Sequence, residues 1–357
     1  MSKLVFVHLY NDRSGSPKVL SQVINATCRR GYSAELLTSY NPDGVLNGLP
    51  ISQKNIFYRR SENKIITLIY YIISQLLLFL NCLRYFRQDV VFYVNTLMPF
   101  GAAVAAWIMR KPVIYHIHET SIKPKILKSF LRFIVNLTAT KIIFVSDFLK
   151  NEESFFNKEQ FVVYNAINVD SVLISPEKKD DKFNVLMACS LKTYKGVLEY
   201  ISIAKHFVEN KEFDFYLVLN ADSKEINVWF NDVSVPPNVK LFSRQTDMTS
   251  FYAKSHLLLN LSRPDEWIET FGLTILEGMS FGLPVIVPPV GGPVEIVENE
   301  REGYLISCYE TQRVVDSIKK MAADSELYNY FSNNAIAKAN FFSLSEFEKN
   351  IIDIIDL

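Results

Sequence analysis

The chain has 357 residues, of which 49% are hydrophobic and 21% charged, a composition that excludes a disordered protein and provides for two domains. The formal net charge is zero, and no nucleic-acid partner is expected. The four cysteines are far apart and form no CxxC or Cys/His cluster, which argues against a zinc site.

The charge is unevenly distributed between the two halves of the chain. Residues 1–172 carry 20 Lys and Arg against 11 Asp and Glu, a net charge of +9. The remainder carries 18 against 27, a net charge of −9. Two interpretations stay open: the first half contacts an anionic partner, or the two halves attract each other.

The first predicted elements are a strand from Leu4 to Tyr10, a loop that contains Gly15, and a helix from Lys18 to Arg30. Ser16 and Pro17 are expected to be the N-cap and the first helical residue. A further strand follows, and this order is typical of the start of a Rossmann-like parallel sheet.

Residues 65–80 form the most hydrophobic stretch, with Ser74 and Gln75 at its centre and basic residues on both sides. Its sixteen residues are fewer than the roughly 20 that a membrane span needs. We therefore expect a helix that is buried or lies on a surface, and not a transmembrane segment.

The strand from Val113 to Glu119 brings His118 to its carboxyl end. Open α/β sheets bind ligands at that edge, so His118 is a candidate site residue. His116 lies two positions earlier and is expected to pack inside the domain.

Residues 122–137 form a predicted basic amphipathic helix, with Lys123, Lys125, Lys128 and Arg132 between apolar residues. Such a helix can lie on an anionic membrane surface. The alternative is an ordinary domain helix with a solvated cationic face.

A charged, proline-containing linker is expected at residues 170–182, after which the strand–loop–helix pattern restarts at Phe183. The predicted domains are residues 1–172 and 183–340. An amphipathic tail follows at residues 345–357.

The stretch from Glu269 to Glu277 places two carboxylates around Gly272 and the start of a predicted helix. The unpaired N–H groups of a helix start bind anions such as a diphosphate, and glycine permits close approach. Carboxylates suit hydroxyl groups better than phosphates, so the expected ligand is a nucleotide sugar. The alternative is a capped surface helix with two solvated Glu side chains.

The sequence Glu269-x-Phe-Gly-Leu-x-x-Leu-Glu277-Gly-Met is followed by Gly-x-Pro-Val-Ile, Gly-Gly-x-x-Glu-Ile-Val and Glu302-Gly-Tyr-Leu-Ile. This order over some forty residues resembles the C-terminal signature of retaining GT-B glycosyltransferases of the GT4-type family. The resemblance implies an α/β fold of the GT-B type. Its two Rossmann-like domains would face a central cleft, and residues 345–357 would pack back onto the first domain.

The resemblance also implies a site. Lys195 corresponds to a lysine that holds the donor diphosphate, together with the amides of Gly272 and Leu273. His118, Glu269 and Lys195 would be catalytic, with Glu269 on sugar hydroxyls and Glu277 on the ribose. The expected donor-binding residues are Gly15, Ser190, Lys192, Lys195, Arg244, Glu269, Phe271, Gly272, Leu273, Thr274 and Glu277. Ser190 stands where the family has an arginine, and Lys192 is the candidate to supply the missing charge.

The implied function is transfer of a sugar from a UDP- or GDP-linked donor to a saccharide or lipid-linked saccharide, with retention and without metal or cofactor. It would serve surface polysaccharide or glycolipid assembly. The chain starts directly with a strand and not a signal sequence, so the expected location is the cytoplasm, or the inner face of the cytoplasmic membrane as a peripheral protein. The alternatives are a nucleotide-sugar epimerase and a catalytically silent membrane-surface assembly protein.

Overall fold

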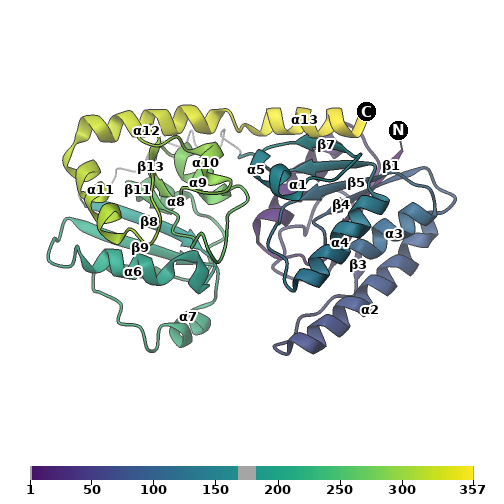
Figure 1. The fold of residues 1–357 in the computed structure, drawn as a ribbon, viewed down its shortest axis with the longest axis horizontal. Helices are drawn as coiled ribbons and strands as arrows, with labels where there is room; N and C mark the ends of the chain where they lie inside the picture. Colours follow the sequence, from purple (N-terminus) through teal and green to yellow (C-terminus); the bar gives the residue numbers. More distant parts are fainter. Residues whose placement is uncertain (1, 168–181, 357) are drawn as a thin grey trace. The chain divides into compact units, whose positions relative to one another are not determined.

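The computed structural model describes residues 2–167 and 182–356 (Figure 1). The chain divides into two compact units. Unit 1 comprises Met1–Asn165 and Leu344–Leu357, and unit 2 comprises Ala166–Ser343. The expected linker at residues 170–182 lies almost wholly outside the described residues.

In the described part of unit 1, seven strands form one sheet in the order β3-β2-β1-β4-β5-β6-β7. All of its strand pairs are parallel. The strands are β1 (Lys3–His8), β2 (Ala34–Ser39), β3 (Ser52–Ile56), β4 (Val90–Asn95), β5 (Val113–Ile117), β6 (Lys141–Phe144) and β7 (Glu159–Val162). The strand order reverses between β1 and β4, and ligands bind beyond the carboxyl ends of the strands at such a point.

The helices of unit 1 are α1 (Gly15–Arg29), α2 (Lys64–Cys82), α3 (Phe100–Ile108), α4 (Lys125–Thr138), α5 (Asp147–Glu153) and α13 (Leu344–Asp356), with a 3₁₀ turn at Leu83–Tyr85. The C-terminal helix α13 lies against α1 in this unit. An ion pair joins Arg29 to Glu348, and the Tyr32 hydroxyl donates to Asp356.

Two details near the amino terminus differ from the prediction. Helix α1 begins at Gly15 with Ser14 as its N-cap, and not at Pro17 with Ser16 as the cap. The Ser14 amide donates a hydrogen bond of 3.0 Å to the Asp12 side chain. This bond forms a tight turn directly before the helix, so the helix begins two residues earlier than predicted. Strand β3 was not predicted, because its polar sequence has no apolar alternation, yet it pairs in parallel with β2 at the sheet edge.

Helix α2 covers the apolar stretch and extends it to nineteen residues. Of the two alternatives that the sequence left open, a buried helix does not describe most of α2. Its buried residues are Tyr71, Ser74, Gln75, Leu78 and Cys82. Most of its isoleucines and leucines are exposed, so the surface-lying alternative describes it better.

Helix α4 begins at Lys125, three residues later than predicted. The interpretation of its basic residues as one solvated cationic face is wrong for two of them. Lys128 and Arg132 both form ion pairs with Glu153, whose side chain is fully buried. Their charges are therefore used inside unit 1 to compensate a buried carboxylate.

In the described part of unit 2, six parallel strands follow the order β10-β9-β8-β11-β12-β13. The strands are β8 (Phe183–Cys189), β9 (Phe213–Leu219), β10 (Val239–Phe242), β11 (Leu257–Leu259), β12 (Val285–Val287) and β13 (Gly303–Leu305). The order reverses between β8 and β11, which marks the ligand edge of this sheet.

The helices of unit 2 are α6 (Val197–Lys205), α7 (Ser223–Trp229), α8 (Thr249–Lys254), α9 (Leu273–Ser280), α10 (Pro293–Ile296), α11 (Thr311–Ala323) and α12 (Ser325–Asn340). Helix α7 was not predicted, although Asp222 and Glu225 form a capping box at its start. Two wholly parallel sheets with helical crossovers confirm the expected α/β class with two Rossmann-like units.

Candidate active site

The centre of the candidate site is an ion pair between Lys195 and Glu269. Lys195 ends the 3₁₀ turn Thr193–Lys195 after β8, and Glu269 lies in the loop after β11, so both are at the switch point of unit 2. The Lys195 side chain is only 14% exposed and that of Glu269 only 19%. The Ser262 hydroxyl also donates to Glu269, at 3.0 Å.

Glycines bring these loops together. Gly196 has a φ of +79°, and a Cβ there would lie 2.1 Å from the carbonyl oxygen of Leu261. A Cβ on Gly291 would lie 2.5 Å from the carbonyl oxygen of Glu269, while the Gly292 amide donates to that same oxygen at 2.8 Å. Only glycine permits such close backbone approach, so the Lys-Gly and Gly-Gly motifs hold the loops after β8 and β12 against the loop after β11.

The electrostatics keep Glu269 ionised. Burial alone would raise the pKa of this carboxyl group, but the Lys195 ammonium beside it and hydrogen bonds from Lys195 and Ser262 hold the pKa below its usual value. The site therefore contains a mostly buried carboxylate and a mostly buried ammonium that neutralise each other.

Two aromatic residues around Lys195 were missed in the sequence. The Lys195 ammonium lies 4.9 Å from the centre of the Trp267 ring. Trp267 stacks on Tyr194 with 5.2 Å between ring centres. An ammonium over an indole face is an attractive cation–π arrangement. The sequence signal for this contact was the position of Trp267, two residues before the Glu269 motif.

The start of helix α9 follows Glu269 by a few residues in the chain. Its N-cap Gly272 has a φ of +109°, a left-handed conformation that favours glycine. Leu273 and Thr274 supply the first helical amides. Phe271 has a buried side chain, 2% exposed, which packs against Phe342, so it offers a ligand its backbone only.

Glu277 lies one turn into α9 and is partly exposed. It accepts a hydrogen bond of 2.7 Å from the hydroxyl of Tyr252, which comes from α8. Tyr252 is buried, and burial together with the neighbouring carboxylate of Glu277 raises its pKa far above the usual value. The hydroxyl therefore stays protonated and acts as a donor that orients Glu277.

A cavity of about 500 Å³ in unit 2 collects three further predicted residues, Ser190, Lys192 and Arg244. Arg244 donates to the side-chain oxygen of Asn220 at 2.7 Å. The remaining lining residues come from the loop after β8, the end of β9 and the unpredicted helix α7: Leu191, Asn220, Ala221, Lys224, Glu225, Val228 and Trp229. Several cations beside an apolar helix face suit an anionic ligand that also has a flat apolar part.

The predicted residues of unit 1 lie at the ligand edge of its own sheet. Gly15 is exposed at the start of α1, after β1, and His118 directly follows β5. The Nε2 atom of His118 lies 2.8 Å from Oδ1 of Asn95, which ends β4. Asn95 in turn lies 3.0 Å from Nδ1 of His8 at the end of β1.

The orientation of Asn95 determines the tautomer of His118. The Asn95 amide nitrogen donates to the carbonyl oxygen of Ser16 at 3.1 Å, and a carbonyl can only accept. The amide oxygen therefore faces His118, whose Nε2 must carry the proton, which leaves Nδ1 as the basic nitrogen. Burial and the neighbouring rings of His116 and His8 lower the pKa of His118 well below its usual value, so the ring is neutral.

His116 is fully buried and its Nδ1 contacts the Tyr93 hydroxyl at 2.8 Å, which agrees with the expected packing role. Among residues 2–167 and 182–356, no group of three or more His, Cys, Asp or Glu side chains is placed to hold a metal ion.

Comparison with known proteins matches both halves of the chain. Residues 172–338 match the family described as glycosyl transferases group 1, and residues 13–171 match glycosyltransferase family 4. Sucrose-phosphate synthase from Spinacia oleracea is 30% identical over 109 residues, which is 30% of this chain and 10% of that protein. The match thus spans about a tenth of the length of this curated relative.

Solved structures match over the full length. HepE from Anabaena, in complex with UDP and glucose, has a TM-score of 0.80 and 20% identity, with 100% of each chain covered. Sucrose-phosphate synthase from Thermosynechococcus elongatus has a TM-score of 0.77 and 14% identity, with 100% of this chain and 98% of that chain covered.

The two parallel sheets and these structural matches define the fold class as GT-B. With both halves matched by the corresponding family descriptions, the chain belongs to the GT4-type glycosyltransferase family, glycosyl transferases group 1.

Proposed function

We propose that the protein transfers a glycosyl unit from a UDP-linked sugar to an acceptor hydroxyl, with retention of configuration at the anomeric carbon. The observation that carries the proposal is the mostly buried Lys195–Glu269 pair at the switch point of unit 2. The UDP and glucose bound to the structurally similar HepE favour UDP as the nucleotide.

The leaving group in this reaction is a nucleoside diphosphate, whose negative charge grows in the transition state. Preorganised positive groups are most effective there. Lys195 and the amides of Gly272 and Leu273 would hold the diphosphate, while Lys192 and Arg244 in the neighbouring cavity would contribute further positive charge. Lys192 would compensate for the serine at position 190.

In this proposal the donor replaces Glu269 as the partner of Lys195. Glu269 then accepts hydrogen bonds from the hydroxyls of the transferred sugar. Glu277, oriented by Tyr252, accepts hydrogen bonds from the ribose. His118 is proposed as a further catalytic residue that acts as a neutral imidazole, because its pKa is low.

Retention is proposed to follow from attack by the acceptor on the same face of the sugar that the leaving phosphate occupies. The phosphate oxygen would take the acceptor proton, so the protein needs no covalent nucleophile. The role of its own residues is to position the donor and to stabilise the departing charge.

The protein is proposed to act without a divalent metal. Fixed cations and helix amides would supply the positive charge that a metal provides in other transferases. Activity in excess EDTA, equal to that in its absence, is the expected result. Loss of activity that Mn²⁺ specifically restores would overturn this part of the proposal.

The proposed acceptor is a saccharide or lipid-linked saccharide in the assembly of a surface polysaccharide or glycolipid, with the enzyme at the cytoplasmic face of the membrane. The excess of nine positive charges in residues 1–172 supports an anionic surface as a partner. Lys123 and Lys125, at the start of α4, remain candidates for this contact.

The test is a panel of nucleoside diphosphates in thermal unfolding, followed by a panel of nucleotide sugars in a diphosphate-release assay. A ligand that binds only the native state raises its stability by RT ln(1 + [L]/Kd). UDP should raise the melting temperature in the wild type and much less in Lys195→Ala. If no nucleoside diphosphate shifts the transition, the proposed donor site is wrong. If binding occurs but no donor releases diphosphate, a catalytically silent protein is the better description.

A further inference from the structure

Helix α2 buries polar side chains and exposes apolar ones, which is the opposite of a normal surface helix. Its polar residues Ser74 and Gln75 are buried, at 1% and 2% exposure. Nine isoleucine and leucine side chains of this fully described helix are 39% to 69% exposed: Ile65, Ile66, Leu68, Ile69, Ile72, Ile73, Leu76, Leu77 and Leu80. We call these nine side chains the outward face of α2. A helix of a soluble protein normally turns its apolar side to the core.

Buried residues in the middle of α2 hold it against the start of α3 and the loop before it. Gln75 accepts a hydrogen bond of 2.9 Å from the amide of Gly101, and the Tyr71 hydroxyl donates to the carbonyl of Met98 at 2.7 Å. A Cβ on Gly101 would lie 2.2 Å from the carbonyl oxygen of Gln75, so the two helices approach as closely as their backbones allow. The orientation of α2 is therefore fixed, and its outward face is not an accident of a loosely attached segment.

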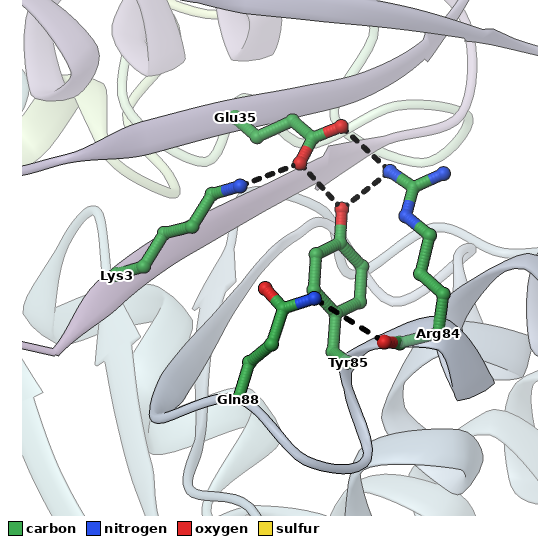
Figure 2. A network of polar contacts seen from close by, with 5 residues as sticks. All are labelled: Lys3, Glu35, Arg84, Tyr85 and Gln88. Carbon is green, nitrogen blue, oxygen red and sulfur yellow. Dashed lines mark hydrogen bonds and ion pairs between the residues drawn. The ribbon is translucent and has the colours of Figure 1, made fainter.

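The carboxyl end of α2 is fastened to the sheet as well. Figure 2 shows Glu35 of β2 held by Lys3 at 2.8 Å, by Arg84 at 2.6 Å and by the Tyr85 hydroxyl at 2.8 Å. Gln88 donates to the carbonyl of Arg84 at 3.3 Å in the same network. Arg84 and Tyr85 belong to the 3₁₀ turn directly after α2, so this end of the helix stays against unit 1.

We propose that the outward face of α2 inserts into an anionic lipid surface, with the helix parallel to the membrane plane. Contiguous apolar surface of this kind marks an interaction site. The chemistry favours lipid as the partner, because residues 59–88 contain five Lys and Arg but only one acidic residue, Glu62. Arg59, Arg60 and Lys64 precede the outward face and Arg87 follows it, where they can meet anionic headgroups.

Helix α2 is long enough to be confused with a membrane span. Nineteen residues extend about 28 Å at a rise of about 1.5 Å per residue, close to the thickness of the hydrocarbon core. A span, however, would have to break the bonds to Gly101 and Met98 and expose Ser74 and Gln75 to lipid. An interfacial helix keeps these bonds and immerses its apolar side by about 5 to 10 Å.

Membrane binding through α2 would depend on burial of apolar side chains, whereas binding through the basic helix α4 would depend on charge attraction. Charge attraction is screened within about 10 Å at 0.1 M salt, whereas burial of apolar side chains is not weakened by salt in this way. Binding through α2 should therefore persist at salt concentrations that abolish purely electrostatic adsorption. The inference concerns location only and does not depend on the proposed transfer reaction.

The experiment is flotation of the purified full-length protein with vesicles of phosphatidylcholine containing anionic phosphatidylglycerol, at 0.1 M and 0.5 M NaCl. The test variant is Ile69→Gln/Ile72→Gln/Leu76→Gln, three exposed positions one to two turns apart. Glutamine is a good helix former, so the helix should remain. The matched control is Leu198→Gln/Tyr330→Gln/Phe341→Gln, which removes three exposed apolar side chains of unit 2.

The expected result is binding of the wild type and the control at both salt concentrations, with at least tenfold weaker partitioning of the test variant. All three proteins should have the same far-UV circular dichroism and closely similar melting temperatures, which shows that the test variant is folded. Three outcomes would overturn the proposal: equal partitioning of test and control, binding of the wild type that disappears at 0.5 M NaCl, or retention in the membrane after carbonate washing, which would mean a span. A lipid-free dimer that the test variant dissociates would instead assign the outward face of α2 to a second copy of the chain.

Discussion

At the scale of single residues, Lys195 is held by a carboxylate in the position where a diphosphate is proposed to bind. Its ammonium contacts Glu269 and lies over the ring of Trp267. Donor binding then exchanges one anionic partner for another, so the lysine is never left as an unpaired, mostly buried charge. Such exchange keeps the desolvation cost of the site small.

We predict that Lys195→Ala weakens UDP binding about 10- to 150-fold, because a hydrogen bond to a charged group contributes about 1.5–3 kcal/mol. The variant should also unfold at lower temperature, since the mostly buried Glu269 carboxylate loses the ammonium group that neutralises it. Calorimetric titration and thermal unfolding measure the two effects. Lys205→Ala, an exposed lysine at the end of α6, is the matched control and should change neither.

A second residue-scale prediction concerns Glu277 and Tyr252. Glu277→Ala should reduce turnover at limiting donor by the same order as Lys195→Ala, because a charge-assisted contact of about 1.5–3 kcal/mol is lost. Tyr252→Phe removes only the hydrogen bond that orients Glu277, so the loss of binding free energy should be smaller than in Glu277→Ala. The Tyr252 variant should therefore raise KM for the donor with little change in kcat. Wild-type kinetics in Glu277→Ala would remove this residue from the site.

At the scale of elements, helix α4 shows how a buried carboxylate uses basic residues that a sequence pattern assigns to the surface. Glu153, at the end of α5, is fully buried and is paired with Lys128 and Arg132 of α4. The Thr120 hydroxyl adds a hydrogen bond of 2.6 Å. This cluster joins α4 to α5.

We predict that Lys128→Met/Arg132→Met lowers the free energy of unfolding by about 3–5 kcal/mol, because it leaves a buried charge unpaired. Adding Glu153→Met should recover most of that loss. The matched control, Lys123→Gln/Lys125→Gln, removes two positive charges near the start of α4 that have no recorded ion pair in the described chain, and should be nearly neutral. Urea denaturation measures all four proteins. Equal stability of the double variant and the wild type would mean that Lys128 and Arg132 do not stabilise the buried Glu153 side chain.

At the scale of the whole molecule, buried titratable groups of unit 1 make stability depend on pH. Burial lowers the pKa of His8 to about 4 and that of His116 to about 3, and lowers that of His118 well below its usual value. Unfolding restores a pKa of about 6.5, so below that pH the unfolded chain binds protons that the folded chain does not. These histidines therefore make stability fall as the pH falls.

Glu119 acts in the opposite direction. Burial raises its pKa to about 7, so the folded protein keeps a proton that the unfolded chain has lost, and this contribution disappears as the pH rises through 7. Between about pH 6.5 and 4.5, the three histidines together bind more protons on unfolding than Glu119 releases, so their effect on stability is the larger one.

We predict a fall in the free energy of unfolding of about 1–3 kcal/mol per pH unit over that interval, measured by urea denaturation at several pH values. His116→Gln should reduce the slope by about one proton, or about 1.4 kcal/mol per pH unit. A stability profile that is flat from pH 7 to 5 would mean that the histidines are hydrated and not buried.

Most strands and helices could be predicted from the sequence, because each depends on local periodicity and on glycine positions. Strand β3 and helix α7 were missed. The ligand edge of the first sheet could also be predicted, because His118 follows a strand at its carboxyl end. Lys195 and Glu269, which are 74 residues apart, were assigned to one site through the resemblance to the GT4-type family, and the structure joins them in an ion pair. The sequence identified Gly196, Gly291 and Gly292 as members of motifs. The structure shows why glycine is required there: neighbouring backbone lies too close for a Cβ atom.

Tertiary structure alone decided which partner each side chain meets. The local pattern of α2 is almost uniformly apolar, so only the close contact with Gly101 shows that Ser74 and Gln75 face inward and the leucines outward. The pairing of Lys128 and Arg132 with Glu153, and of Tyr252 with Glu277, joins separate elements. Local periodicity determines which element forms, but the direction in which a side chain points has meaning only once a second element is packed against it.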